Sequence, residues 1–82
     1  EVAPVPVVFE APLEGWWNHG LRIRHRATGS VVATGVFHLG ADLERGLPPG
    51  GYVVEQVQRV TGRVRRLPLE VGDVACEVPW VD

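Results

Sequence analysis

The turn and strand that decide the fold read Gly46-Leu47-Pro48-Pro49-Gly50-Gly51-Tyr52-Val53-Val54-Glu55. Two prolines followed by two glycines make a rigid turn, because proline fixes one backbone dihedral and glycine adopts conformations that other residues avoid. The aromatic and β-branched residues that come next favour a strand. This stretch therefore predicts a tight turn that leads directly into a β-strand.

Short strands and turns continue along the rest of the chain. Glycine or proline interrupts almost every window, so the longest candidate for helix, residues 41–45, has room for one turn. Strands are predicted over residues 5–10, 21–27, 30–39, 52–60, 63–69 and 74–81, with a short seventh at 42–44 and a bulge at Gly35. The sequence thus predicts an all-β fold with almost no helix: a small antiparallel β-sandwich of six to seven strands.

The first predicted strand has an unusual start. Val5, Val7 and Phe9 alternate onto one face, but Pro4 and Pro6 remove two donors from any hydrogen-bond ladder. Residues 1–10 are therefore expected to be an edge strand or an N-terminal arm that adds a strand to a neighbouring molecule.

Length and composition limit the remaining possibilities. The chain has 82 residues, enough for a single domain (residues 1–82) of marginal stability. Cys76 is the only cysteine, so no internal disulfide can form, and oligomerisation or burial in a larger assembly is the expected support. The net charge of −2 gives no reason to expect nucleic acid as a partner, and no apolar run is long enough for membrane insertion. All eight basic residues are arginine, a bias that a GC-rich genome explains.

Residues 21–55 resemble a known family. The segment Leu21–Gly29, followed by Val32, Phe37, Leu39 and the turn at 46–55, is similar to the prealbumin-like, B-type repeat domains of Gram-positive pilins and collagen adhesins. Its second half is also similar to carboxypeptidase regulatory-like domains. The resemblance implies an Ig-like or prealbumin-like sandwich with a mechanical or presenting role.

The same resemblance raises the question of a covalent crosslink. In the pilin-type domains a lysine and an asparagine form an isopeptide bond beside an acidic residue, whose position Glu55 roughly matches. This chain contains no lysine, so an intramolecular isopeptide bond is excluded. Glu55 is then expected to be an ordinary solvated strand residue.

No motif for catalysis or metal binding stands out. His19, His25, His38 and Cys76 match no zinc spacing. Ser30 follows a turn that does not resemble a nucleophile elbow, and the carboxylates are scattered as expected for solubility. The sequence therefore predicts no enzyme, and no catalytic, cofactor or metal residues.

Two basic segments are candidates for binding. Arg22, Arg24 and Arg26 share one face of a predicted strand, and Arg63, Arg65 and Arg66 form a second segment. If the two strands adjoin, six guanidinium groups would bind phosphate, sulfate or the carboxylates of a partner. The alternative is a solvated face on which these arginines pair with Glu10, Glu55, Glu70 or Glu77.

The adjacent tryptophans Trp16 and Trp17 lie in a loop bounded by glycines. In one interpretation a tryptophan caps the sandwich while the other contacts a partner or a sugar ring; in the other, both cap the core. Trp80 alternates with Val78 and Cys76 and is expected in the core.

These features predict a non-catalytic structural and interaction module of a surface assembly, either a cell-surface stalk or a virion accessory. It would be extracellular, on a cell surface or on a virion, and part of a homo-oligomer or larger assembly. The residues expected to bind protein partners are Val5, Val7, Trp16, Trp17, Arg22, Arg24 and Arg26. The alternative is a carbohydrate-binding module that uses Trp16, Trp17 and Tyr52. A protease inhibitor presenting Pro48–Gly50 is a third hypothesis.

Overall fold

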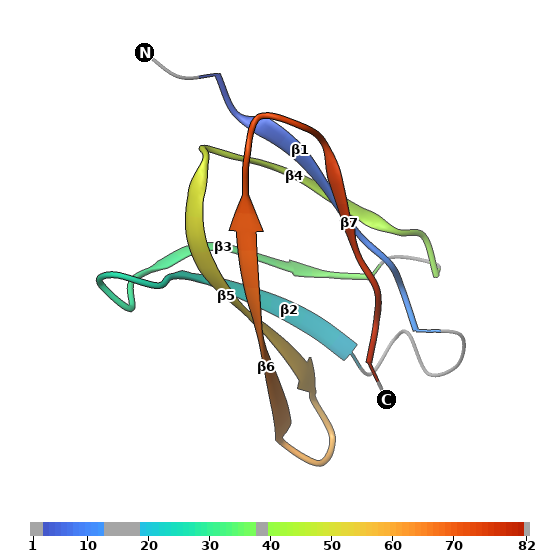
Figure 1. Cartoon of the computed structure of the whole chain (residues 1–82). Helices are drawn as coiled ribbons and strands as arrows, with labels where there is room; N and C mark the ends of the chain where they lie inside the picture. The colour runs from blue at the N-terminus through green and yellow to red at the C-terminus, as the bar shows by residue number, and fades with distance from the viewer. Residues whose placement is uncertain (1–2, 13–18, 38–39, 82) are drawn as a thin grey trace.

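Two β-sheets packed face to face form the molecule (Figure 1). The computed structural model describes residues 3–12, 19–37 and 40–81. Its strands are β1 (Val5–Phe9), β2 (His19–His25), β3 (Val31–Val36), β4 (Leu43–Leu47), β5 (Gly50–Gln58), β6 (Arg63–Val71) and β7 (Cys76–Val78). No helix occurs among the described residues, and accordingly none there could cross a membrane. The predicted all-β sandwich of six to seven strands is confirmed.

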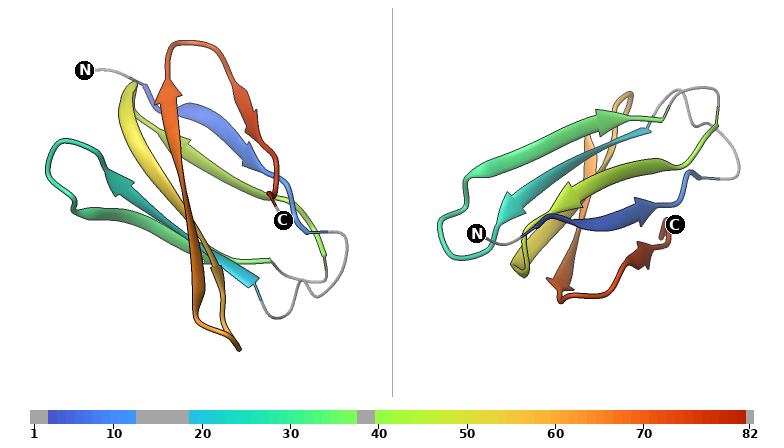
Figure 2. Two further views of the ribbon diagram at one scale, coloured as in Figure 1. Left: turned by 60° about the horizontal axis from the view of Figure 1, so that its bottom comes forward. Right: turned by 90° about the horizontal axis from the view of Figure 1, so that it is seen from above.

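The strand order is β4-β1-β7 in the smaller sheet and β3-β2-β5-β6 in the larger one (Figure 2). Neighbouring strands are antiparallel except for β1 and β7, which run parallel. The chain crosses between the sheets at the Pro48–Gly51 turn, because β4 belongs to one sheet and β5 to the other.

The turn itself is built as the sequence predicts. Gly50 has a φ of 152°, a conformation that residues with a Cβ rarely adopt, so the turn requires glycine there. The hydroxyl of Tyr52 donates a hydrogen bond of 2.5 Å to the Pro48 carbonyl and closes the turn from inside. Tyr52 is buried, and burial raises the pKa of its hydroxyl.

The prediction of an edge strand or free arm at residues 1–10 is wrong. β1 is the central strand of the smaller sheet, and Val5, Val7 and Phe9 are buried. The prolines are tolerated because β7 is short and pairs only with Val7–Phe9. Because Pro6 has no N–H, it can lie opposite Gly46 of β4 only as a pair without hydrogen bonds. In such a pair the backbone N of Pro6 points away from β4, toward the side on which β7 pairs only from Val7 onward.

The predicted bulge at Gly35 is also wrong. The register between β2 and β3 shifts next to Ile23 and Arg24, where Val32 is the extra residue. Gly35 has a different role: a Cβ there would clash with a methyl group of Leu43 in the other sheet. Glycine therefore permits the close approach of the two sheets at this point.

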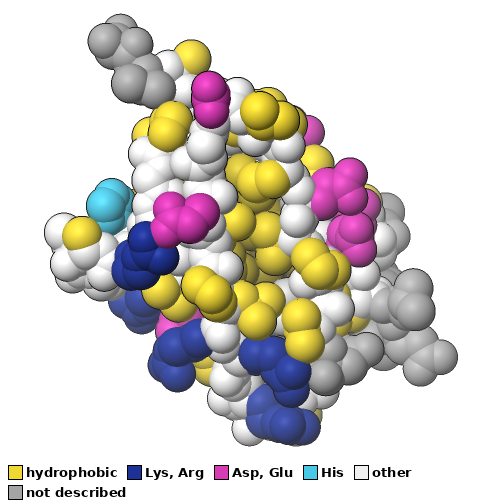
Figure 3. Space-filling view, in the orientation of Figure 1, with side chains coloured by type: hydrophobic (Ala, Val, Ile, Leu, Met, Phe, Trp, Pro, Cys, Tyr) yellow, Lys and Arg dark blue, Asp and Glu magenta, His cyan; other side chains and the backbone are white. Residues whose placement is uncertain are grey.

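The core fills the space between the sheets with alternate residues from each strand. It consists of Val5, Val7, Phe9, Leu21, Ile23, Phe37, Leu47, Tyr52, Val54, Val71 and Val78. Hydrophobic side chains are also visible from outside between β6 and β7, which are edge strands of the two sheets (Figure 3).

Candidate functional site

The outer face of the larger sheet carries rows of side chains that the strand register defines. One row across the sheet consists of Thr34, Arg22, Glu55 and Arg66, from β3, β2, β5 and β6 in that order. The neighbouring row consists of Val36, Gly20, Val57 and Val64. A cationic row therefore lies directly beside an apolar row.

Glu55 is the centre of the cationic row. One of its oxygens, Oε1, accepts hydrogen bonds from the Nε atoms of Arg22 at 2.5 Å and Arg24 at 2.8 Å. The other oxygen, Oε2, accepts one from Nε of Arg66 at 2.8 Å. We name this group of four side chains the Glu55 cluster.

The expectation that Glu55 is solvated is wrong, because the three arginines cover it. The Glu55 side chain is 2% exposed, whereas those of Arg22 and Arg24 are each 36% exposed and that of Arg66 is 65% exposed. Arg22 and Arg66 lie directly opposite Glu55 on the neighbouring strands, and Arg24 reaches it diagonally. The carboxylate is thus buried under the aliphatic parts and Nε atoms of long side chains.

Two opposing effects set the pKa of Glu55. Burial raises the pKa of the carboxyl group, because it disfavours the charged form. Hydrogen bonds from Arg22, Arg24 and Arg66, together with the coulombic attraction of Arg22, lower it by more, so that the pKa is about 2 against an ordinary value of 4.5. Glu55 therefore stays ionised at neutral and mildly acidic pH.

This depressed pKa predicts a specific acid sensitivity. The contribution of Glu55 to stability is complete above its unfolded pKa of 4.5 and is lost as the pH falls toward about 2. We expect the free energy of unfolding to fall by about 3 kcal/mol from this group across that window. Urea unfolding at a series of pH values measures the fall. A Glu55→Gln variant should show a flatter pH dependence there, and an equal slope in both proteins would contradict the prediction.

Only part of the predicted arginine patch is brought together. Arg22 and Arg24 meet Arg66 at Glu55, whereas Arg26 pairs with the exposed Glu70 and passes over Gly51. Arg63 and Arg65 lie on the opposite face of β6, because side chains alternate along a strand. A single patch of six guanidinium groups does not form, and the alternative of pairing with Glu55 and Glu70 is confirmed for four arginines.

The other residues predicted to bind partners are either buried or outside the described residues. Val5 and Val7 are buried in the core and unavailable to a partner. Trp16 and Trp17 lie outside the described residues, as does His38. Tyr52 is buried with its hydroxyl bonded to Pro48, so it offers no platform for a sugar.

The Glu55 cluster carries excess positive charge toward the solvent. Three guanidinium groups and one carboxylate leave a net charge of two positive units. Each arginine uses its Nε on Glu55, and Arg24 also donates from Nη1 to the Gly29 carbonyl. Within the described part of the chain, the terminal nitrogens of Arg22 and Arg66 have no hydrogen-bond partner.

A shallow groove of about 490 Å³ adjoins the cluster on the same sheet. Arg22, Thr34, Val36, Val57 and Arg59 line it. In the described ranges, no three histidine, cysteine or acidic side chains are grouped to hold a metal ion. The arrangement therefore offers anchored cations and apolar side chains, which are features of a binding surface.

Comparison with known protein families, curated proteins and solved structures finds no match to this chain.

Proposed function

We propose that this chain is a non-catalytic interaction domain that binds an acidic segment of a protein partner on the outer face of its larger sheet. The observation that carries the proposal is the Glu55 cluster, in which one buried carboxylate holds three arginines by their Nε atoms, while the terminal nitrogens of Arg22 and Arg66 have no partner among the described residues. Arginine is enriched at the centres of protein interfaces, and its guanidinium group binds carboxylates in a defined geometry.

Preorganisation supports this proposal. A free arginine side chain loses rotamer freedom when it binds, whereas Nε of each arginine in the cluster is already fixed on Glu55. The adjacent Val36 and Val57 supply apolar contact area, and Val36 is 54% exposed. A partner with alternating acidic and apolar residues complements both rows.

The wider setting of the domain belongs to the same proposal. The resemblance of residues 21–55 to prealbumin-like surface domains supports a role in a cell-surface or virion assembly, with the chain in a homo-oligomer or larger complex. Sedimentation velocity tests the oligomer. The buried β1 leaves the N-terminal segment out of the proposed interface.

Peptide binding tests the proposed interface. The probe is a fluorescein-labelled peptide of alternating glutamate and valine, and the comparison peptide has glutamine in place of glutamate. Fluorescence anisotropy is expected to show that only the acidic peptide binds and that added salt weakens binding. Equal binding of both peptides, or binding of neither, would contradict the proposal.

A variant that leaves the Glu55 cluster intact locates the site. Thr34→Glu places a carboxylate beside Arg22 in the same row and is expected to weaken acidic-peptide binding by about tenfold. Val74→Glu makes the same charge change at an exposed position in the turn before β7 and should leave binding unchanged. If the two variants bind equally well, the peptide does not use this face.

A further inference from the structure

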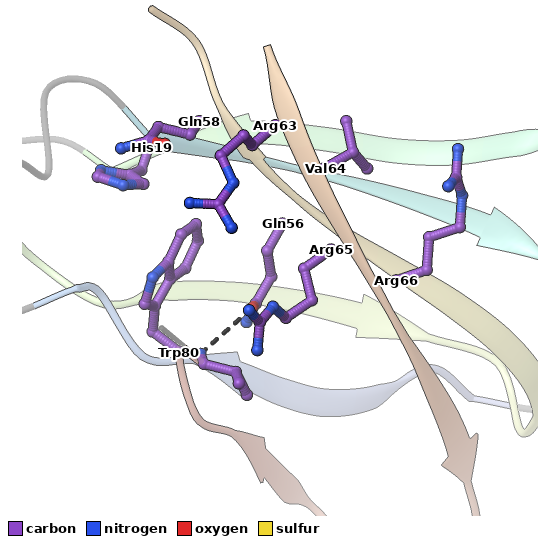
Figure 4. Close-up of a pocket in the computed structure, with 9 residues that line it drawn as sticks. His19, Gln56, Gln58, Arg63, Val64, Arg65, Arg66 and Trp80 are labelled. Carbon is purple, nitrogen blue, oxygen red and sulfur yellow. Dashed lines mark hydrogen bonds between the residues drawn. The ribbon is translucent and has the colours of Figure 1, made fainter. Parts of the chain in front are cut away.

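A second cavity lies along β6, and it is lined both by residues on the face opposite the Glu55 cluster and by Val64 and Arg66 (Figure 4). It has a volume of about 460 Å³ and is lined by His19, Gln56, Gln58, Arg63, Arg65 and Trp80, among others. Figure 4 shows Arg63 and Arg65 reaching from β6 toward Trp80, while Arg66 points away. The volume is in the range of small-molecule sites.

Gln56 holds one wall of the cavity in place. It is a buried residue, and its amide donates to the Pro79 carbonyl at 3.1 Å and accepts from the Val81 backbone N–H at 3.2 Å. Both bonds fix the backbone on either side of Trp80. The indole ring also makes edge contacts with Phe37 and His19, at centroid distances of 5.6 and 4.8 Å. The aromatic wall is therefore preorganised.

The opposite wall carries uncompensated positive charge. Arg63 and Arg65 are exposed, and their side chains have no hydrogen-bond or ion-pair partner among the described residues. Among the described residues that line the cavity there is no carboxylate. Two guanidinium groups facing a shared cavity favour an anion such as a carboxylate or a sulfate.

We propose that this cavity binds an acidic sugar, a saccharide unit that carries carboxylate or sulfate groups. Trp80 supplies the flat surface on which a sugar ring packs, and Arg63 and Arg65 bind the anionic group. Gln58 accepts a hydrogen bond from Thr61 through Oε1, so its amide N–H groups remain to bind hydroxyl oxygens. One aromatic wall among hydrogen-bonding groups suits a hydroxylated ring better than a flat aromatic ligand, which would need a second apolar wall.

The test uses a heparin disaccharide that carries uronate and sulfate groups. Calorimetry gives the affinity, and nitrogen–proton correlation spectra follow the indole N–H signal of Trp80, assigned by its absence in Trp80→Phe. We expect the disaccharide to bind and to shift this signal. Neutral cellobiose and inorganic sulfate should each bind at least about tenfold more weakly. Equal affinity for inorganic sulfate would overturn the proposal, since the cavity would then recognise only the anion.

Matched arginine variants locate the binding. The double variant Arg63→Gln, Arg65→Gln is expected to lower the affinity by about tenfold or more, whereas Arg59→Gln, a nearby exposed arginine outside the cavity, should leave it unchanged. An equal loss of affinity in the double variant and in Arg59→Gln would overturn the proposal, because it would indicate general electrostatic attraction to the protein and no specific site.

This cavity borders the proposed protein interface, since Val64 and Arg66 line it as well, but different variants separate the two sites. Thr34→Glu should retain disaccharide binding while losing the acidic peptide, and the Arg63, Arg65 double variant should do the reverse. Loss of the disaccharide in Thr34→Glu would assign its binding to the outer face and overturn the cavity proposal.

Discussion

Replacing Glu55 by glutamine is expected to lower the free energy of unfolding by about 3 to 5 kcal/mol, because removing one partner of a buried ion pair leaves uncompensated charge. Arg22, Arg24 and Arg66 would then share a neutral amide, with three positive charges close together. Urea denaturation at neutral pH measures the effect. Binding of the acidic peptide should weaken as well, since the arginines lose the carboxylate that orients them.

Glu70→Gln is the matched control for this variant. Glu70 also pairs with an arginine, Arg26, but its side chain is 66% exposed. An exposed ion pair contributes about 1 kcal/mol or less. A loss in Glu55→Gln no larger than that in Glu70→Gln would show that the buried carboxylate does not organise the cluster.

Val7→Asp is expected to leave the domain largely unfolded. Val7 is completely buried in the central strand of the smaller sheet, between β4 and β7. An unpaired carboxylate there costs more than about 4 kcal/mol, whereas a chain of this length has a total stability of about 4 to 12 kcal/mol. Circular dichroism and the dispersion of amide proton signals report the loss of structure.

The same substitution at an exposed valine is the control. Val74 is 76% exposed, so Val74→Asp should change the free energy of unfolding by about 0.5 kcal/mol or less. A folded Val7→Asp protein would contradict the placement of β1 at the centre of its sheet. It would instead favour the N-terminal segment as a detachable arm.

The contrast between Val7 and Pro6 explains why the sequence predicts an edge strand or an arm where the structure has the central strand β1. Alternation correctly assigns Val5, Val7 and Phe9 to one buried face. Proline marks a missing donor, and the usual place for a missing donor is a sheet edge. In this structure the missing donor belongs to Pro6, and β7 pairs with β1 only from Val7 to Phe9. The length of β7 is set by residues far along the chain, so the sequence around Pro6 does not indicate it.

Glu55 shows a related limit. Period-two alternation correctly places Arg22 and Arg24 on one face of a strand, and Arg66 on the opposite face of β6 from Arg65. Alternation does not indicate which strands are neighbours or in which register. Glu55 is buried only because β5 lies between β2 and β6, with Arg22 and Arg66 directly opposite. No signal in the sequence of β5 distinguishes this glutamate from a solvated one.

The sequence by itself determined the all-β class, the turn at Pro48–Gly51 and the face of most strands, because dihedral preferences and alternation are local properties. It also excluded the isopeptide bond, since the chain has no lysine. The tertiary structure alone decided that β1 is central, that Glu55 gathers three arginines, and that Arg63, Arg65 and Trp80 share a cavity. These features depend on strand order and register, and both are determined by contacts between segments that lie far apart in the sequence.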